Sequence, residues 1–264
     1  TWQVLRSEFD EMMLNNAAEQ GVRVHQETRV LDVLFDGDRA VGVSIQGEDG
    51  KPREIRAKVV VDASGQSSMI INRFGLRVSD PELNKGAIWS YFEGAYRDVG
   101  RDEGATIVLQ TDNKEAWFWY IPQADDVVSI GVVGDNDYML KGRGTPAEIF
   151  FQEVDKCPAV KGRMEGATQV DDLIVTKEFS YLTDRSAGDG WVLVGDAWGF
   201  IDPVYSSGVF FALKSGELAS ECIIDALQAN DPSEERLGKW LPGFKEKTNW
   251  VRKLVHAFYS GGFR

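Results

Sequence analysis

The chain has 264 residues, of which 43% are hydrophobic and 27% charged, enough apolar material for one large or two small cores. Its 42 acidic residues exceed its 29 basic ones and give a formal net charge of -13. That excess argues against a nucleic-acid partner, because phosphate binding needs clustered Lys and Arg, and it disfavours docking on anionic membranes. No apolar run is long enough to span a bilayer, so we expect no stable membrane insertion.

Cysteine and histidine, which often carry chemistry, form no pattern here. Cys157 and Cys222 lie far apart without metal-ligand or redox spacing, so we expect two buried thiols in a reducing cytoplasm and no metal site. His25 and His256 are likewise isolated in the sequence from ligand-like neighbours. A histidine in that setting is more often structural than catalytic, and we assign neither a role.

The first part of the chain predicts a helix followed by a β-meander. Helical spacing runs from Arg6 to about Gln20 and stops at Gly21. One side of this helix would carry Leu5, Phe9, Met12, Met13 and Ala17. Strands are expected at 22–24, 28–35, 40–45, 53–57 and 59–61, with turns at 36–38 and 47–51. The segment Thr1-Trp2-Gln3 is an unusual start for a chain, and we expect that sequence precedes it.

The middle of the chain predicts an antiparallel sheet. Segments rich in β-branched and aromatic residues are separated by polar turns, and they span 86–96, 105–110, 117–121 and 127–133. Thr145 and Pro146 then cap and start a helix that continues to about Val154. A further strand is expected at 172–181.

A strand, a polar turn and a helix follow at 191–229, and this is the most informative segment. The apolar run 191–194 predicts a buried strand, and a helix is expected from Ser207 to about Ala229. Asp196 enters a turn of small residues, where its carboxylate can contact a sugar-like hydroxyl. The helix start offers free backbone N–H groups and the positive end of a dipole, which suits an anion. Further helix is expected after a break at 230–233, with the aromatic and apolar residues Trp240, Phe244, Trp250, Leu254 and Phe258.

The run Gly195–Gly208 resembles the second FAD-binding motif of the flavoprotein monooxygenase superfamily. The resemblance implies FAD as the cofactor, with Asp196 on the ribityl chain and the helix start at Ser207 directed at the flavin ring. The cofactor-binding residues that it implies in this part of the chain are Gly195, Asp196, Pro203, Gly208 and Val209.

A second resemblance to the same superfamily lies near the start of the chain. The pattern Q-V-x-R-x-x-F-D is matched by Gln3, Val4, Arg6, Phe9 and Asp10, and D-A-S/T-G by residues 62–65. The resemblance implies that Gln3 and Arg6 lie near the flavin, that the backbone of Val30 meets the adenine, and that Gly65 lies beside the nucleotide. The structural alternatives are a solvated first-turn arginine at Arg6 and a plain core valine at Val30.

Residues 117–122 spell W-x-W-x-I-P. Alternation puts Trp117, Trp119 and Ile121 on one face of a strand that ends at Pro122, and a structural aromatic strand is the ordinary reading of such a run. The spelling resembles a signature of flavin-dependent halogenases. In that family the motif lies near the flavin, and its bulk is thought to discourage ordinary monooxygenation. The resemblance implies that these four residues form part of an active-site wall.

A second halogenase pattern, F-x-x-P-x-x-S-x-G, is matched by Phe200, Pro203, Ser206 and Gly208. The family resemblance implies that the backbone N–H groups of Ser207 and Gly208 hold chloride or bromide. Such a role is physically reasonable, because the start of a helix is an anion site. Two motifs in the family's order identify the chain as resembling the flavin-dependent halogenases over essentially its whole length.

The sequence also departs from the family in three ways. Tyr205 stands where halogenases of free tryptophan usually have glutamate, which favours the branch that acts on phenols, pyrroles and carrier-bound aromatics. A G-x-G-x-x-G strand–helix turn for the pyrophosphate is missing from the chain. The family's catalytic lysine belongs to that missing region, so no catalytic residue is assigned. Lys214, within the helix after Ser207, is expected to be a helix-face lysine.

The resemblance implies a mixed α/β fold. We expect the three-layer ββα FAD/NAD(P)-binding fold of the flavoprotein monooxygenases, without its N-terminal βαβ unit and with an antiparallel substrate-side sheet. The expected division is a partial FAD-binding domain at 1–80 and 186–230, a substrate-side sheet domain at 81–185, and the start of a helical region at 231–264.

The function implied is that of an FAD-dependent halogenase. Reduced flavin from a separate reductase, oxygen and chloride or bromide would halogenate a small electron-rich aromatic substrate, free or carrier-tethered. A first alternative is an aromatic hydroxylase or a geranylgeranyl-reductase-like enzyme of the same fold. A second, supported by the missing dinucleotide motif, is a truncated non-catalytic binding or scaffold module.

Overall fold

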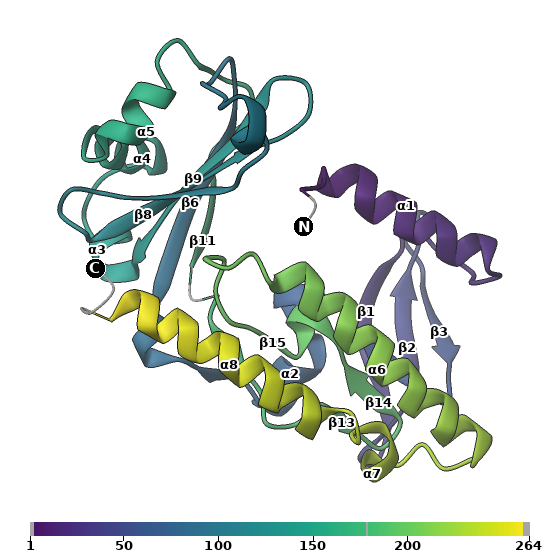
Figure 1. The fold of residues 1–264 in the computed structure, drawn as a ribbon. Coiled ribbons are helices and arrows are strands. Elements are labelled where there is room, and N and C mark those ends of the chain that lie inside the picture. Colours follow the sequence, from purple (N-terminus) through teal and green to yellow (C-terminus); the bar gives the residue numbers. More distant parts are fainter. Residues whose placement is uncertain (1–2, 178, 261–264) are drawn as a thin grey trace. The chain divides into compact units, whose positions relative to one another are not determined.

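A computed structural model describes residues 3–177 and 179–260 (Figure 1). The expectation about the start of the chain therefore falls partly outside the described residues, as does position 178 of the expected strand at 172–181. The chain divides into two compact units, unit 1 with Thr1–Val24 and Leu83–Glu178, and unit 2 with His25–Glu82 and Phe179–Arg264. Each unit has its own hydrophobic core.

Unit 1 is built, within its described residues, on a six-stranded antiparallel sheet of order β10-β6-β9-β8-β7, with β11 also paired to β6. The strands are β6 (Lys85–Glu93), β7 (Ile107–Gln110), β8 (Ala116–Pro122), β9 (Val127–Asp135), β10 (Thr168–Gln169) and β11 (Ile174–Lys177). They form where β-branched and aromatic residues are concentrated, because such side chains pack well on a pleated surface. The predicted antiparallel sheet is confirmed.

Helices cover one face of this sheet (Figure 1). They are α3 (Asn136–Leu140), α4 (Pro146–Asp155) and α5 (Pro158–Arg163), while α1 (Arg6–Glu19) also belongs to unit 1. Helix α4 starts as predicted, because Thr145 and Glu148 form a reciprocal capping box and Pro146 fills the first turn. Phe118 and Phe150 are fully buried in the core between the helices and the sheet. Alternate residues of β8 thus point into this core.

Unit 2 contains three small sheets in its described part. A meander orders β1 (Arg29–Asp36), β2 (Arg39–Gln46) and β3 (Pro52–Arg56). A second sheet orders β13 (Ala187–Gly188), β14 (Trp191–Leu193) and β4 (Val60–Asp62), and a third orders β15 (Gly199–Phe200), β12 (Tyr181–Leu182) and β5 (Val78–Ser79). The pair β14–β4 is parallel, so the carboxyl ends of these two strands meet at one edge of their sheet.

The helices of unit 2 are α2 (Met69–Phe74), α6 (Gly208–Gln228), α7 (Glu234–Leu237) and α8 (Leu241–Tyr259). Trp191 and Val192 of the predicted apolar strand are almost completely buried, and Trp240 and Phe244 pack into the same core. Across residues 3–177 and 179–260, no helix combines the length and apolar character needed to cross a bilayer.

Some local predictions are wrong. Residues 22–24 do not form a strand, and the strand expected to reach residue 96 ends at Glu93. Helix α1 exists, but all of its residues are at least partly exposed, so its apolar side is not buried within the described chain. The short helices α2, α3 and α5 were not predicted, because they are too short to show a helical period. The division into a cofactor domain and a substrate-side domain stays a prediction, and the region expected at 1–80 contributes to both units.

Candidate functional site

Two sequence motifs meet in unit 2 at the carboxyl ends of the parallel strands β4 and β14. The chain leaves β4 through residues 62–65 and leaves β14 through Gly195 and Asp196. Each exit is a short 3-10 turn, η1 (Gly65–Ser67) and η4 (Gly195–Ala197), and the two turns lie against each other. Parallel pairing therefore brings together two segments that are about 130 residues apart in sequence, at the edge of the sheet where ligands bind in open α/β folds.

Buried polar side chains hold these two turns in place. Asp62 is 5% exposed and accepts hydrogen bonds from the backbone N–H groups of Ser64 and Ile70, at 3.0 and 2.8 Å. The hydroxyl of Tyr181 lies 3.0 Å from that of Ser68 and donates to the carbonyl of Asp196 at 2.6 Å. Burial raises the pKa of Tyr181, so this hydroxyl stays protonated and able to donate at neutral pH.

The turn at Gly195 and Asp196, to which a cofactor role is predicted, packs closely against α6. Gly195 has φ +57 and donates its N–H to the Ser215 hydroxyl of α6 at 2.8 Å, and a Cβ at this position would lie 3.2 Å from Ala212. Glycine thus allows the turn to approach α6 closely. Asp196, the next residue, is half-buried.

The segment from Asp202 to Ser206 leads directly into helix α6. Asp202 is 2% exposed, and its Oδ1 accepts the N–H of Val204 at 2.9 Å. Ser206 has φ +51, and its N–H donates to the carbonyl of Pro203 at 2.9 Å. Ser180, the residue before β12, donates its hydroxyl to the carbonyl of Ile201 at 2.6 Å. This bond holds the residue that precedes Asp202. The turn is therefore fixed by local hydrogen bonds on both sides of Pro203.

The residues predicted to hold halide form the start of α6. Ser207 is the N-cap, Gly208 is the first helical residue and Val209 follows, and all three are half-buried. The first N–H groups of a helix have no partner within it and carry the positive end of its dipole. Gly208 packs under the ring of Phe200, where an added Cβ would lie 3.1 Å from the ring. The geometry suits a small anion or the electron-rich end of a flavin ring.

The residues of unit 2 fit one end of FAD. A half-buried carboxylate at Asp196 and the start of α6 belong to the same turn-and-helix segment, which suits a polyol chain joined to an anionic ring. Gly65, in the neighbouring turn, has φ +63 and open space where a Cβ would point, so a ligand could approach its backbone closely. Val30 is 41% exposed on β1, so it is not part of the core that the described residues form.

The segment Gly142–Gly144 is not a Gly-rich turn of the pyrophosphate-binding kind. Such a turn follows a strand, whereas this segment follows the short helix α3. Lys214 lies on α6 and forms an ion pair with Glu217 at 2.7 Å, as expected for a helix-face lysine.

The aromatic motif occupies strand β8 of unit 1. Alternation is confirmed, because Phe118 and Tyr120 point into the helix-covered core while Trp119 and Ile121 are half-buried. Gly131 of β9 pairs with Trp119, and a Cβ there would lie 2.2 Å from the indole. The absent side chain makes room for that ring. The indole N–H of Trp119 donates to Ser129 at 3.2 Å.

The predicted wall residues thus differ in accessibility. Trp117 is 3% exposed and Pro122 is also buried, whereas Trp119 and Ile121 present part of their surface. The ring of Trp119 lies between two other indoles. Its centroid is 6.3 Å from that of Trp117 and 5.9 Å from that of Trp89. The three indoles thus form a continuous row of ring contacts.

Gln3 and Arg6, both predicted to lie near the flavin, have polar partners within unit 1. The amide of Gln3 donates to the hydroxyl of Thr106 at 2.8 Å. Arg6 pairs with Asp10 one turn along α1 at 2.7 Å, and both side chains are more than half exposed. Hydrogen bonding to Arg6 lowers the pKa of the Asp10 carboxyl. The contacts agree with the solvated-arginine alternative, and the flavin role of both residues stays a prediction.

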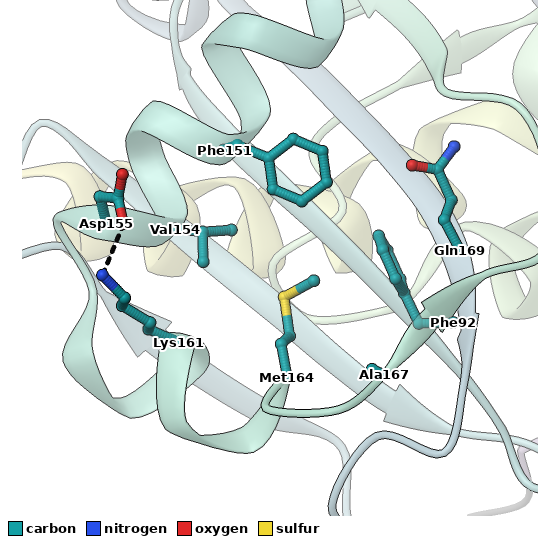
Figure 2. Close-up of a pocket in the computed structure, with 8 residues that line it drawn as sticks. All are labelled: Phe92, Phe151, Val154, Asp155, Lys161, Met164, Ala167 and Gln169. Atoms are coloured by element: carbon teal, nitrogen blue, oxygen red, sulfur yellow. Dashed lines mark hydrogen bonds and ion pairs between the residues drawn. The ribbon is translucent and has the colours of Figure 1, made fainter.

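Unit 1 also has a surface pocket of about 300 Å³ (Figure 2). Its lining residues are Phe92, Phe151, Val154, Asp155, Lys161, Met164, Ala167 and Gln169. Phe92 and Val154 belong to the helix-covered core, so the pocket lies on the helix side of the sheet and not on the side of Trp119. Asp155 and Lys161 form an exposed ion pair at its rim, 2.8 Å apart.

The structure corrects two expectations about single residues. His256 is not isolated, because its ring nitrogens lie 3.0 Å from carboxylate oxygens of both Asp80 and Glu82. Cys222 is only partly buried, in contrast to Cys157 at 1% exposed. Burial raises the pKa of both thiols. The histidine contact joins residues more than 170 positions apart, which sequence spacing could not reveal.

Sequence reasoning also missed the residues that support the site. Each of three side chains bonds a backbone group of the 195–208 segment: Ser215 from α6, Tyr181 from β12 and Ser180 from the position just before β12. Within the run, Asp202 followed by Pro203 favours a turn. No sequence pattern marks the three residues that hold the segment, because their contacts join separated positions.

Comparisons with known proteins agree on one family. The family profile described as tryptophan halogenase matches residues 1–261. A 1H-pyrrole-2-carbonyl-(peptidyl-carrier protein) brominase of Pseudoalteromonas luteoviolacea is 33% identical over 88% of this chain and 57% of its own length. The corresponding chlorinase of Pseudomonas fluorescens is 33% identical over 89% of this chain and 53% of its own length. The structure of the flavin-dependent brominase Bmp2 superposes with a TM-score of 0.91 at 31% identity, covering 100% of this chain and 66% of that one.

These relatives are longer than the chain. It spans about half the length of the curated relatives, so their activity belongs to more protein than the residues described above. The match to solved halogenases confirms the predicted mixed α/β fold.

Proposed function

This chain belongs to the tryptophan halogenase family of flavin-dependent halogenases, and on that basis we propose that its protein halogenates an electron-rich aromatic compound with FAD and chloride or bromide. The observation that carries the proposal is the segment Gly195–Gly208, in which a half-buried aspartate and a helix start follow one strand end. A carboxylate for a polyol and amides for an anion are the two contacts that such a reaction needs near the flavin ring.

Asp196 would hold the ribityl chain by accepting hydrogen bonds from its hydroxyl groups. Tyr181 bonds the backbone carbonyl of Asp196, and Ser215 of α6 bonds the N–H of Gly195, so the backbone that carries this carboxylate is held before the ligand arrives. Preorganisation of this kind lowers the entropic cost of binding. When bound, reduced FAD together with oxygen supplies the two-electron oxidation that converts halide into an electrophilic halogen.

The backbone N–H groups of Ser207 and Gly208 would hold the halide ion. The partial positive charge at these N–H groups comes from the backbone dipole of α6, so it does not depend on the titration of a side chain. Phe200 lies over Gly208 and excludes water from one side of that position, and a less hydrated amide attracts an anion more strongly.

The names of two relatives and the residue at position 205 support our proposal for the substrate class. Two curated relatives are named for a pyrrole-2-carbonyl group on a peptidyl-carrier protein. Tyr205 is 41% exposed beside the helix start, where halogenases of free tryptophan usually have glutamate. We therefore favour a phenol or pyrrole, free or carrier-tethered, and a separate flavin reductase as the source of reduced FAD.

The test is a product assay on the complete gene product, with chemically reduced FAD, oxygen and a pyrrole-2-carbonyl thioester or a simple phenol. We expect a product that carries the bromine isotope pair in bromide buffer and is absent without halide. A hydroxylated product in both buffers would instead identify an aromatic hydroxylase. Tight FAD binding without any oxidised or halogenated product, for either substrate class, would contradict the proposal.

A matched pair of variants tests the assigned carboxylate. Asp196→Ala should weaken FAD binding at least tenfold, because a charge-assisted hydrogen bond is lost from the cofactor site. Glu217→Gln removes a charge on the exposed side of α6 and should leave FAD binding unchanged. Equal FAD affinity of the two variants would contradict the role of Asp196.

A further inference from the structure

The buried carboxylate of Asp202 accepts a hydrogen bond from α8, the last helix of the chain. Its Oδ2 accepts the hydroxyl of Tyr259 at 3.0 Å, across 57 positions of sequence. Its other oxygen, Oδ1, accepts the N–H of Val204 and closes the first half of the turn. With only 2% of Asp202 exposed, water does not readily replace a donor that this carboxylate loses.

Tyr259 is the last residue of α8, and this helix is anchored independently of Asp202. Arg252 donates to Asp80 at 2.7 Å, and His256 lies 3.0 Å from the same carboxylate oxygen. The hydroxyl of Tyr205 also reaches the carbonyl of Leu254 at 3.3 Å. The end of α8 is therefore held at the turn by contacts other than its own tyrosine.

We propose that Tyr259 is a positioning residue for the anion turn, which we define as residues 202–208. Its hydroxyl fixes the carboxylate of Asp202, the carboxylate fixes Val204, and the turn then delivers Ser207 and Gly208 to the helix start. Ser206 is held at φ +51, a conformation that a serine keeps only when the surrounding turn enforces it. The consequence for halide rests on the proposed function, whereas the consequence for the turn does not.

The first test measures the turn itself and needs neither flavin nor halide. Tyr259→Phe in the complete gene product should raise amide hydrogen exchange in peptides that cover 202–211 by about tenfold, the effect of losing one hydrogen bond to a charged group. The matched control is Ser260→Ala. It removes a hydroxyl one residue later, and that hydroxyl bonds within α8 to Ala257 at 2.7 Å. Equal exchange of wild type and Tyr259→Phe across 202–211 would overturn the inference.

The second test asks whether positioning reaches the halide. In Tyr259→Phe we expect the KM for bromide to rise several-fold, with kcat at saturating bromide and the affinity for FAD unchanged. A fall in kcat and in FAD affinity at an unchanged bromide KM would indicate general damage to unit 2 and overturn the positioning role. If the wild-type protein shows no dependence on halide, the proposed function fails, and hydrogen exchange alone decides the role of Tyr259.

Discussion

The aromatic strand of unit 1 and the anion turn of unit 2 are built in different ways. Strand β8 is held by packing: Phe118 and Tyr120 fill a core, and Trp119 fits over the bare backbone of Gly131. The anion turn is held by buried polar contacts, among them Asp202 with Val204 and Asp202 with Tyr259. The first region therefore depends on volume and the second on hydrogen-bond partners.

The difference bears on what each region can do. A packed aromatic surface is rigid and tolerates little change in shape, which suits a wall. A turn whose polar groups are satisfied by distant side chains presents its backbone amides in one fixed arrangement, which suits an anion site. Substitutions that change packed volume should therefore destabilise the protein more than substitutions that remove hydrogen bonds.

Phe118→Ala should cost about 4 kcal/mol of unfolding free energy, because a fully buried ring leaves a cavity in the core of unit 1. Urea denaturation followed by circular dichroism measures the change. The control is Val108→Ala in β7, where the side chain is already 39% exposed and a loss below about 1 kcal/mol is expected. Equal losses for the two variants would contradict a packing-based β8.

Gly131→Ala should cost about 2 kcal/mol, because the new Cβ would lie 2.2 Å from the indole of Trp119 and force the ring to move. A changed tryptophan emission spectrum should accompany the loss of stability. Gly162→Ala is the matched control, since it lies in α5 with open space at its Cβ position and should be neutral or stabilising. A stable Gly131→Ala protein with an unaltered spectrum would show that the ring is not confined.

Asp80→Asn should cost roughly 1.5 kcal/mol near neutral pH by weakening the contacts with Arg252 and His256 that anchor α8. Burial alone would raise the pKa of Asp80, but hydrogen bonding to Arg252 and its positive charge hold the pKa below the usual 3.8. Because the folded pKa is the lower one, the stabilisation is present above pH 3.8 and is lost as the pH falls through the folded value.

Acid unfolding curves check this sign. The unfolding free energy of the wild type should fall more steeply below about pH 4 than that of Asp80→Asn, since the variant has no carboxylate to protonate at this position. Parallel curves for the two proteins would show that the Asp80 cluster does not anchor α8.

Ser215→Ala should have the smallest effect on stability, about 1 kcal/mol, because it removes the hydrogen bond accepted from the N–H of Gly195 and the local one donated to the carbonyl of Ala212. Its effect on FAD should be proportionately larger, with a several-fold weaker affinity, since the turn that carries Asp196 is loosened. Titration of the protein with FAD measures this affinity. Ser220→Ala, on the exposed side of the same helix, is the control and should leave the affinity unchanged.

The same contrast explains how much the sequence could predict. The faces of β8 could be predicted, because successive side chains of a strand point to opposite faces and this alternation is visible in the sequence. The apolar run at 191–194 likewise predicted the buried strand β14. The parallel partner of β14, at Val60–Asp62, and the tyrosines that support the site could not be predicted, because their contacts join distant segments. Val22–Val24 has strand-forming residues, yet no neighbouring strand pairs with them within the described chain.

We propose that the start of α6 holds a halide ion. The most direct measurement is anomalous diffraction at the bromine edge from FAD-bound crystals of the complete gene product grown in bromide. We predict a peak within hydrogen-bond distance of the backbone nitrogens of Ser207 and Gly208, weakened in Tyr259→Phe. Bromide peaks elsewhere on the protein, with none at these two amides, would contradict the account.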